Sequence, residues 1–276
     1  MLRENGRIEA VLPPVIGHRG AAACAPENTL AGFRQAKALG CRWVEFDVRL
    51  TADGEPVVLH DNRLERTTSG RGRVSGLSLA AVRRHDAGSW FHPSFAGERV
   101  PRLQEVLALL AELALGANVE LKAARGKEAA TGELVADLLA RSWPAASTHL
   151  LISSFEADAL AAARACAPHI ARGILFHRVP KNWRVVARDL GSATVHADHR
   201  RLRPAIVSEI RQAGYPLLAY TVNDPERAKT LFDWGVTSVF SDVPQRLHGA
   251  AARGGFRQSI VADPASAAIP RRGSVW

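Results

Sequence analysis

Short apolar runs, many of them β-branched, alternate along the chain with longer segments in which apolar residues recur every three to four positions. The runs predict buried strands at residues 15–17, 43–50, 56–59, 118–121, 149–153, 172–176, 193–196, 216–222 and 238–240. The segments between them predict amphipathic helices at residues 29–39, 103–115, 131–139, 156–166, 203–213 and 225–234. Strand and helix therefore alternate over most of the chain.

One connection departs from this alternation. The second and third predicted strands are separated by Asp53-Gly54, and Asp-Gly between apolar runs is a strong hairpin signal. The third strand should therefore return antiparallel to the second and bring His60 back toward Asp47. Without this return strand, eight parallel strands joined by helices remain, which is the pattern of a (β/α)8 TIM barrel. A doubly wound open sheet is the alternative, but its usual GxGxxG turn does not follow the first strand.

Two segments lack any clear periodicity. Residues 62–99 are rich in Arg, Thr, Ser and Gly and carry aromatic residues among turn formers. We expect a small insertion there, between the hairpin and the next helix, which forms a lid or pocket wall on the side where the strands end. Residues 249–276 gain Gly, Ala, Pro and Arg, which predicts a loosely ordered tail. Residues 1–248 would then form one barrel domain.

The composition is typical of a single soluble domain in a reducing compartment. A chain of 276 residues, 47% of them hydrophobic, can bury one substantial core. It has no apolar run of the roughly 18 residues needed to cross a bilayer, and its first segment lacks the apolar stretch of a secretory signal. The three cysteines form no CxxC pair, so we expect neither disulfides nor a thiolate zinc site. These features predict a cytoplasmic protein without stable membrane insertion and leave its oligomeric state open.

The net charge of +9 favours an anionic partner. Nucleic acid is one such partner, but the basic residues are scattered among Ala and Leu, and no block of about five adjacent basic residues occurs. Stacking motifs typical of RNA-binding proteins are also missing from the sequence. We therefore expect a small anionic substrate and no nucleic acid.

Reactive side chains gather where the predicted strands end. Barrel enzymes carry their active sites at the carboxyl ends of the strands. Side chains two residues apart on a strand point to the same side, so Glu45 projects with Asp47, and Glu120 projects with Lys122. The full set at these strand ends is His18, Arg19, Glu45, Asp47, His60, Glu120 and Lys122.

The three acids of this set predict a metal site. Carboxylates that converge at low dielectric repel one another strongly, and a divalent cation relieves that repulsion. Because Glu45, Asp47 and Glu120 offer only oxygen, Mg²⁺ or Ca²⁺ is favoured over zinc, and Mn²⁺ is a further candidate. The alternative is that the acids are solvated or paired with basic neighbours, namely Arg42, Arg49 and Lys122.

Two histidines and two cations complete the predicted chemistry. Imidazole exchanges protons near neutral pH, so His18 and His60 suit an acid/base pair. Arg19 and Lys122, together with a metal, would neutralise a phosphate and stabilise the charge that builds on its oxygens, and we also expect them to form salt bridges. Glu27 in the PENT segment would orient Arg19 and cap the next helix. The combination predicts metal-assisted cleavage of a phosphoester.

These motifs resemble those of the glycerophosphodiester phosphodiesterase family. The matching pieces are GHRG with PENT, EFDVRLTADGEPVVLHD, PRLQEVLALL, VELK, SSF, YTVND and VFSDVP, in order across residues 15–247. A single piece such as HRG is weak, whereas the whole series with suitable gaps is specific. The resemblance implies a (β/α)8 barrel with a small insertion, a divalent cation, and hydrolysis of a glycerophosphodiester to sn-glycerol 3-phosphate and an alcohol.

The resemblance also implies roles for individual residues. Tyr220 departs from the family pattern, in which Trp more often precedes TVN, and we expect it to change the fit of the glycerol or alcohol group without loss of chemistry. The remaining implied roles are acid/base catalysis by His18 and His60, metal ligation by Glu45, Asp47 and Glu120, phosphate contact by Arg19 and Lys122, and a pocket wall formed by Phe155.

Two other functions would use the same site. Cleavage of lysophospholipids would need an apolar channel in the insertion, for which Trp90, Phe91 and Phe95 are the candidates, although such aromatics more often seal a loop onto its own barrel. A catalytically silent barrel that binds phosphoesters is the second alternative, and the presence of both histidines and all three acids argues against it. His196 and Asp198 lie at the end of the seventh predicted strand, which faces the same mouth, and they stay outside the assigned set.

Overall fold

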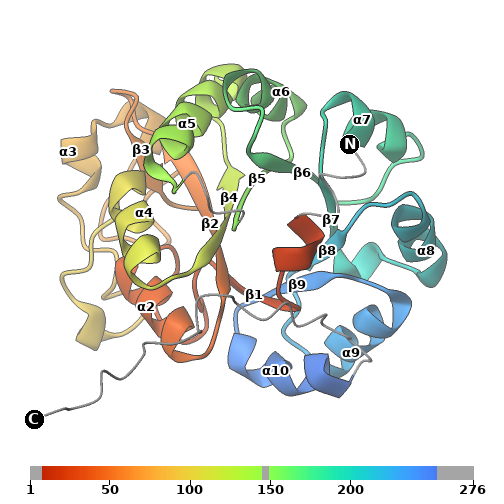
Figure 1. The fold of residues 1–276 in the computed structure, drawn as a ribbon. Helices are drawn as coiled ribbons and strands as arrows, with labels where there is room; N and C mark the ends of the chain where they lie inside the picture. Colours follow the sequence, from red (N-terminus) through yellow and green to blue (C-terminus); the bar gives the residue numbers. More distant parts are fainter. Residues whose placement is uncertain (1–7, 145–148, 254–276) are drawn as a thin grey trace, which may run out of the picture.

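The chain folds into a closed barrel of parallel strands surrounded by helices (Figure 1). The structure, a computed structural model, describes residues 8–144 and 149–253. Its strands are β1 (Val15–His18), β2 (Trp43–Leu50), β3 (Pro56–Val58), β4 (Gly116–Leu121), β5 (Leu150–Ser154), β6 (Ala171–Phe176), β7 (Thr194–Asp198), β8 (Leu217–Tyr220) and β9 (Ser238–Ser241). They follow the order β1-β9-β8-β7-β6-β5-β4-β2-β3, and a further pairing of β1 with β2 closes the sheet. Apart from β3, the strands form the eight-stranded parallel barrel that the pattern predicted.

The third strand is the antiparallel partner of the second, as the Asp-Gly signal indicated. β3 pairs with β2 so that Leu50 lies opposite Pro56. Gly54 in the turn has φ 79, in the left-handed region that glycine adopts without a steric penalty. The Leu59 N–H donates to the Asp47 carbonyl oxygen over 3.0 Å. This last bond continues the pairing beyond β3 and brings the end of the hairpin alongside the end of β2.

Helices cover the outside of the barrel (Figure 1). All six predicted helices are present, and their bounds are α2 (Leu30–Ala38), α4 (Leu103–Glu112), α5 (Glu128–Ser142), α6 (Ala157–Cys166), α8 (Pro204–Gln212) and α9 (Pro225–Trp234). The pattern missed α7 (Trp183–Asp189) and α10 (Pro244–Arg253). α10 includes the first residues of the predicted tail, and residues 254–276 lie outside the described part of the chain. None of the described helices is long and apolar enough to cross a membrane.

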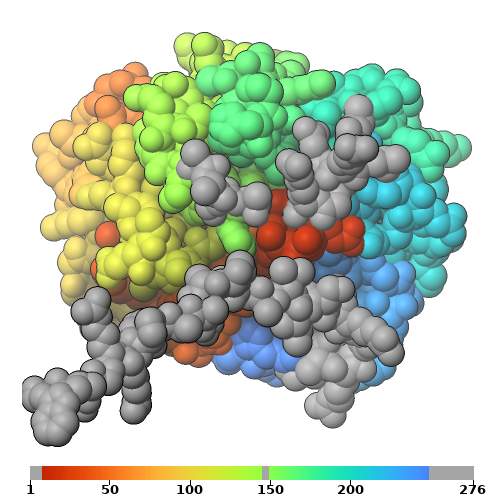
Figure 2. Space-filling model, in the orientation of Figure 1, coloured from red at the N-terminus to blue at the C-terminus, as the bar shows by residue number. Residues whose placement is uncertain are grey.

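The amino-terminal segment closes one end of the barrel. Residues 8–11 are helical, and they lie across the opening, where they appear in red in Figure 1 and fill the centre of the same face in Figure 2. Ile8 and Leu12 are 3% and 5% exposed and belong to a cluster that includes Trp43 at the beginning of β2. Because this plug blocks the amino ends of the strands, a pocket inside the barrel opens at their carboxyl ends.

The insertion at residues 62–99 has a small core of its own. It contains the short helices η1 (Val74–Gly76), α3 (Leu79–Val82) and η2 (Pro93–Phe95) between β3 and α4. Its apolar side chains pack against the hairpin rather than against the main core, in a cluster made of Val57, Leu59, Leu64, Val74, Val82, Ala87 and Val100. The insertion is therefore anchored on β3, beside the carboxyl ends of the strands.

The packing of α5 on α6 predicts that one methyl group added at Gly132 would destabilise the fold. A β-carbon at Gly132 would lie 2.0 Å from the carbonyl oxygen of Ala159, and that backbone atom cannot move without shifting α6. We expect Gly132→Ala to lower the free energy of unfolding by about 1–3 kcal/mol through overpacking. The control is Gly76→Ala, because Gly76 is exposed with nothing within 4 Å of the added carbon. Urea unfolding followed by tryptophan fluorescence measures both, and equal stabilities would contradict the prediction.

Candidate active site

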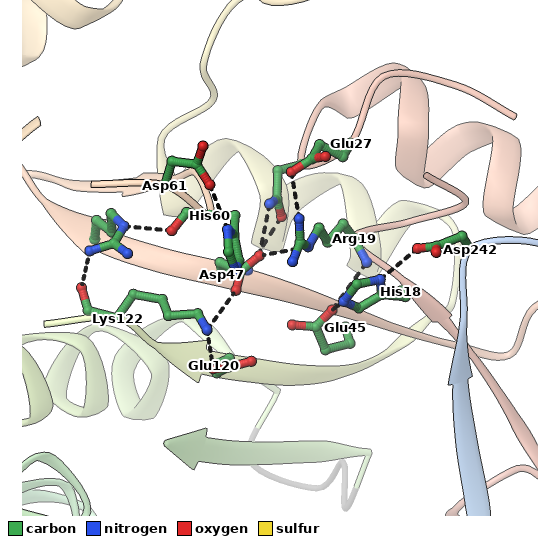
Figure 3. A network of polar contacts seen from close by, with 12 residues as sticks. His18, Arg19, Glu27, Glu45, Asp47, His60, Asp61, Glu120, Lys122 and Asp242 are labelled. Carbon is green, nitrogen blue, oxygen red and sulfur yellow. Dashed lines mark hydrogen bonds and ion pairs between the residues drawn. The ribbon is translucent and has the colours of Figure 1, made fainter. Parts of the chain in front are cut away.

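The carboxyl ends of the strands surround one pocket with a volume of about 160 Å³. Asp47 is 1% exposed, and its carboxylate contacts both Arg19 and Lys122 next to that pocket (Figure 3). The structure thus brings together every site residue that the sequence indicated. Apart from Asp47, these residues line the pocket itself, and they are His18, Arg19, Glu45, His60, Glu120, Lys122, Phe155 and Tyr220.

Three buried carboxylates form the centre of the site. Glu45 and Asp47 belong to β2 and Glu120 to β4, and the parallel register sets Asp47 opposite Glu120. Each offers one oxygen that lies within 4.8 Å of the other two. Their residues are only 3%, 1% and 8% exposed. Alternation along β2 and the register between two neighbouring strands are therefore sufficient to build the cluster.

Two cations contact this cluster from either side. Nε of Arg19 lies 3.4 Å from Oδ2 of Asp47, and the Arg19 backbone N–H donates to Oε2 of Glu45 over 3.1 Å. Arg19 follows β1 with φ 51, so its backbone occupies the left-handed region. Nζ of Lys122 lies 3.6 Å from Oδ1 of Asp47 and also pairs with Glu120. The predicted salt bridges of both cations are present.

The two cations do not balance three buried carboxylates. Burial raises the pKa of Glu45 well above its usual range, and the nearby Asp47 and Glu120 raise it further. Burial also raises the pKa of Glu120, to about 7, against the opposing charge of Lys122. For Asp47, the charges of Arg19 and Lys122 outweigh burial and hold the pKa of that carboxyl below its usual range. The site therefore has room for additional positive charge.

Asn28 is a site residue that the sequence analysis missed. Its side-chain amide donates to Oδ2 of Asp47 over 2.9 Å, and its side-chain oxygen accepts from the Asp47 N–H over 3.3 Å. Asn28 is 1% exposed and has φ 57. Asn tolerates this left-handed backbone better than most residues, so an Asn directly before a helix cap was an available signal. Asn28 fixes the position of the Asp47 carboxylate.

His18 is held by an acid from the other end of the chain. Its Nδ1 lies 2.6 Å from Oδ1 of Asp242, which follows β9. The Asn223 amide donates to the second oxygen of Asp242 over 2.7 Å. Nε2 of His18 lies 3.8 Å from Oε2 of Glu45 and therefore points toward the carboxylate cluster. Both Asp242 and Asn223 lie in quoted motifs, but the sequence did not indicate which histidine they contact.

His60 is held in the same manner by its neighbour in the chain. Its Nδ1 lies 2.7 Å from Oδ1 of Asp61. Burial lowers the pKa of His60 below its usual value, although the charge of Asp47 opposes that shift. Each imidazole thus has Nδ1 on a carboxylate, which leaves its Nε2 for a ligand in the pocket.

Arg66 of the insertion connects the two sides of the site. Its guanidinium donates to both oxygens of Asp61, over 2.7 and 3.0 Å, and to both oxygens of Glu27, over 2.7 and 2.8 Å. Glu27 in turn accepts from Arg19 over 2.8 Å. A continuous chain of charged hydrogen bonds therefore runs from His60 to Arg19. The composition of residues 62–99 predicted an insertion near the strand ends but gave no indication of this arginine.

The expectation for Glu27 was half correct. Glu27 does orient Arg19, as the preceding contacts show. The cap of α2 is instead provided by Thr29, whose hydroxyl oxygen accepts from the Gly32 N–H over 3.1 Å. Both oxygens of Glu27 are engaged by Arg19 and Arg66, so its carboxylate does not reach the helix.

Aromatic side chains form one wall of the pocket. The Phe155 and Tyr220 rings meet edge to face with 5.9 Å between their centroids, and His177 stacks on Phe155 at 4.2 Å. The Tyr220 hydroxyl donates to the Phe176 carbonyl oxygen over 3.0 Å, which fixes the ring. His177 lines the pocket and was not assigned from the sequence.

The aromatics of the insertion do not extend this wall. Trp90, Phe91 and Phe95 pack edge to face on one another, with centroids 5.8 and 5.7 Å apart. None of these three aromatic residues is among the described residues that line the pocket. They pack on one another, with Trp90 40% exposed, and do not open an apolar channel into this pocket.

The fold and the site define a (β/α)8-barrel enzyme with the side chains of a phosphodiester hydrolase. The comparison with protein families agrees with this class. The model of the glycerophosphoryl diester phosphodiesterase family matches residues 18–246. The chain belongs to this family.

Individual relatives match over most of their length. A glycerophosphodiester phosphodiesterase of Caldanaerobacter subterraneus subsp. tengcongensis is 32% identical over 243 residues, which cover 87% of this chain and 98% of that protein. The solved structure of an Oleispira antarctica phosphodiesterase with the product sn-glycerol-3-phosphate has a TM-score of 0.86 at 39% identity and covers 89% of this chain and 99% of that one. A glycerophosphodiester phosphodiesterase structure from Agrobacterium tumefaciens has a TM-score of 0.70 at 28% identity, with 87% and 100% covered.

The contacts of Arg66 predict that it positions His60 through Asp61 and Arg19 through Glu27. We expect Arg66→Gln to lower kcat/KM for glycerophosphocholine by about tenfold to hundredfold, because small displacements of His60 and Arg19 are costly in a preorganised site. Arg66→Lys should recover part of this loss, since it keeps the charge but not the paired geometry.

Arg63→Gln is the matched control for this prediction. Arg63 lies in the same segment and pairs with Glu65 over 2.6 Å on the surface, so its removal changes the net charge by the same amount. Steady-state kinetics should show normal turnover for Arg63→Gln. Equal losses of kcat/KM in the Arg63 and Arg66 variants would mean that the change in net charge is responsible, and not the loss of the Arg66 hydrogen bonds to Asp61 and Glu27.

Proposed function

We propose that the protein hydrolyses glycerophosphodiesters to sn-glycerol 3-phosphate and an alcohol, with His18 and His60 as general acid and base and a divalent cation at Glu45, Asp47 and Glu120. One observation carries this proposal. Two imidazoles, each with Nδ1 on a carboxylate, line the same small pocket as the buried carboxylates. The product bound by the Oleispira antarctica relative supports the substrate class.

A hard divalent cation fits the donor set. Oε1 of Glu45 is buried and has no hydrogen-bond partner in the described part of the chain, a costly arrangement for a carboxylate unless a ligand completes it. All donors are oxygen, which suits Mg²⁺, Ca²⁺ or Mn²⁺. When bound, the cation would act as a Lewis acid that stabilises negative charge on the phosphate oxygens.

Arg19 and Lys122 would hold the phosphate. Burial lowers the pKa of Lys122, but Glu120 and Asp47 outweigh burial and raise it overall, so the ammonium stays charged. Its Nζ lies 5.3 Å from the centre of the Phe155 ring, which places fixed charge next to the aromatic wall. Both cations would neutralise the anion and stabilise the charge that increases on its oxygens in the transition state.

The histidines would transfer protons through Nε2. Nδ1 of His18 is engaged by Asp242 and Nδ1 of His60 by Asp61, so each ring is held in one orientation. One imidazole removes a proton from the attacking hydroxyl while the other protonates the leaving alkoxide. Two routes use this arrangement: attack by the neighbouring glycerol hydroxyl, which gives a cyclic phosphate that water opens, or direct attack by water.

The dimensions of the pocket favour a glycerophosphodiester over a lysophospholipid. Its volume of about 160 Å³ is below the ~300 Å³ at which pockets for drug-sized ligands begin. It would therefore enclose a glycerophosphoryl group and leave the alcohol at the mouth. The aromatics that a lysophospholipid channel would need pack on one another instead.

The acid/base assignment predicts large losses of turnover. His18→Ala and His60→Ala should each lower kcat for glycerophosphocholine by about a hundredfold to ten-thousandfold, because each removes a proton-transfer group. His169→Ala is the control, since His169 is exposed and remote from the pocket lining. Circular dichroism checks that each variant folds. Near-full turnover by a folded His18→Ala protein would refute the assignment.

The carboxylate cluster predicts uptake of a divalent ion. Titration calorimetry with Mg²⁺, Ca²⁺ and Mn²⁺ should detect binding to the wild-type chain and a loss of binding in Asp47→Asn. The matched control is Asp198→Asn, because Asp198 is also buried at a strand end but pairs with Arg200 over 2.8 Å. Chelation should abolish turnover, and readdition of the ion should restore it. A wild-type protein that turns over fully in chelator contradicts the prediction.

A further inference from the structure

Two buried polar side chains that line the pocket take no part in the proposed mechanism. His196 of β7 and Asn118 of β4 both line the pocket and are 0% and 1% exposed. We call these two residues the pocket floor. Nδ1 of His196 and Oδ1 of Asn118 have no hydrogen-bond partner within residues 8–144 and 149–253. A buried polar atom without a partner is unfavourable, so a ligand that completes both would bind favourably.

The local structure holds the His196 ring in place. Its Nε2 lies 2.9 Å from Oγ1 of Thr194, and its ring packs at 5.4 Å from that of Phe240. A β-carbon at Gly173 would lie 2.6 Å from that Nε2 and 2.3 Å from Oγ1 of Thr194. Because residue 173 is a glycine, the His196 imidazole has room to lie over β6. The remaining ring nitrogen, Nδ1, is the one without a protein partner.

Asn118 is anchored in a comparable way. Its side-chain amide donates to Oγ of Ser153 over 2.9 Å, which leaves its carbonyl oxygen without a protein partner. Asn118 lies two residues before Glu120 on β4, so both side chains face the barrel interior at successive levels. The parallel register sets Asn118 opposite Glu45, so Asn118 lies level with that carboxylate and one level below Asp47 and Glu120.

A hydroxyl group complements both floor residues. Burial lowers the pKa of His196 to about 3, so the imidazole is neutral and its Nδ1 either donates or accepts according to the tautomer. The Asn118 side chain likewise offers an oxygen, or a nitrogen if its amide is turned. A hydroxyl accepts from the Nδ1–H of His196 while it donates its one hydrogen to Oδ1 of Asn118, or donates to Nδ1 while it accepts from a turned Asn118 amide. A phosphate oxygen only accepts, and a quaternary ammonium does neither.

We infer that His196 and Asn118 bind the terminal hydroxyl of the glycerol moiety, so that the substrate enters the pocket with this hydroxyl first. The inference rests on the proposed function, in which Arg19 and Lys122 hold the phosphate. The terminal hydroxyl is the one farthest from phosphorus, so it is the group that reaches past the phosphate contacts to the floor residues. The floor would then select glycerol phosphodiesters over diesters of diols that lack this group.

The test compares two substrates that share the reacting atoms. Glycerophosphocholine has the terminal hydroxyl, and 2-hydroxypropyl phosphocholine lacks it but keeps the neighbouring hydroxyl. We expect wild-type kcat/KM to favour glycerophosphocholine by about tenfold to hundredfold, the value of a hydrogen-bonded hydroxyl in a buried site. His196→Phe should reduce this preference to about threefold or less by slowing glycerophosphocholine alone. His169→Phe, the same change on the exposed surface, should keep the full preference.

A second measurement uses the unaltered protein, in case His196→Phe fails to fold. Calorimetry should show that sn-glycerol 3-phosphate binds about tenfold or more tightly than propane-1,2-diol 1-phosphate. Equal binding of the two phosphates overturns the role of the floor, as does an unchanged preference in a folded His196→Phe protein. Failure of the proposed function gives a different result, because the wild-type enzyme would then hydrolyse neither diester while the two phosphates still differed in affinity.

Discussion

Three carboxylates share one buried end of the barrel, and within the described part of the chain Arg19 and Lys122 are the fixed cations in contact with them. The rest of the site is arranged around this imbalance. Arg19 and Lys122 keep Asp47 ionised, whereas burial raises the pKa of Glu45 and Glu120. Such a cluster persists in a fold only if hydrogen bonds or a ligand compensate for the lost hydration. The structure supplies part of this compensation through backbone and amide donors, and the remaining capacity is what a cation and an anionic substrate would use.

The barrel and the insertion contribute different parts of this arrangement. Parallel register between β2 and β4 builds the cluster, and closure of the barrel brings Asp242 to His18 across 224 residues of sequence. The insertion adds Arg66, which ties the hairpin end to the turn after β1. The scaffold therefore places the charges, and the insertion restrains His60 and Arg19, the proposed proton-transfer and phosphate-binding groups. Rigid placement of this kind lets fixed charges stabilise a transition state without reorganisation.

The pocket lining also combines groups of different character. Charged groups suited to a phosphate surround the carboxylate cluster, aromatic rings stand along one side, and two neutral polar side chains, His196 and Asn118, are each anchored on one atom. The plug formed by residues 8–11 closes the opposite end of the barrel, so a ligand enters from one side only. A small polar molecule with an anionic end and a hydroxyl end matches this lining.

The sequence by itself determined the strands, the hairpin at Asp53-Gly54 and the seven charged or imidazole residues placed at the strand ends, because periodicity and turn chemistry act over a few neighbouring positions. Phe155 and Tyr220 were indicated only by the family resemblance. It did not reveal α7, in which only two side chains are buried, or the helical plug. Only the tertiary structure decided which groups restrain the histidines and Arg19. Asp242 and Arg66 meet their partners 224 and 39 residues away, and such contacts exist only after the barrel closes.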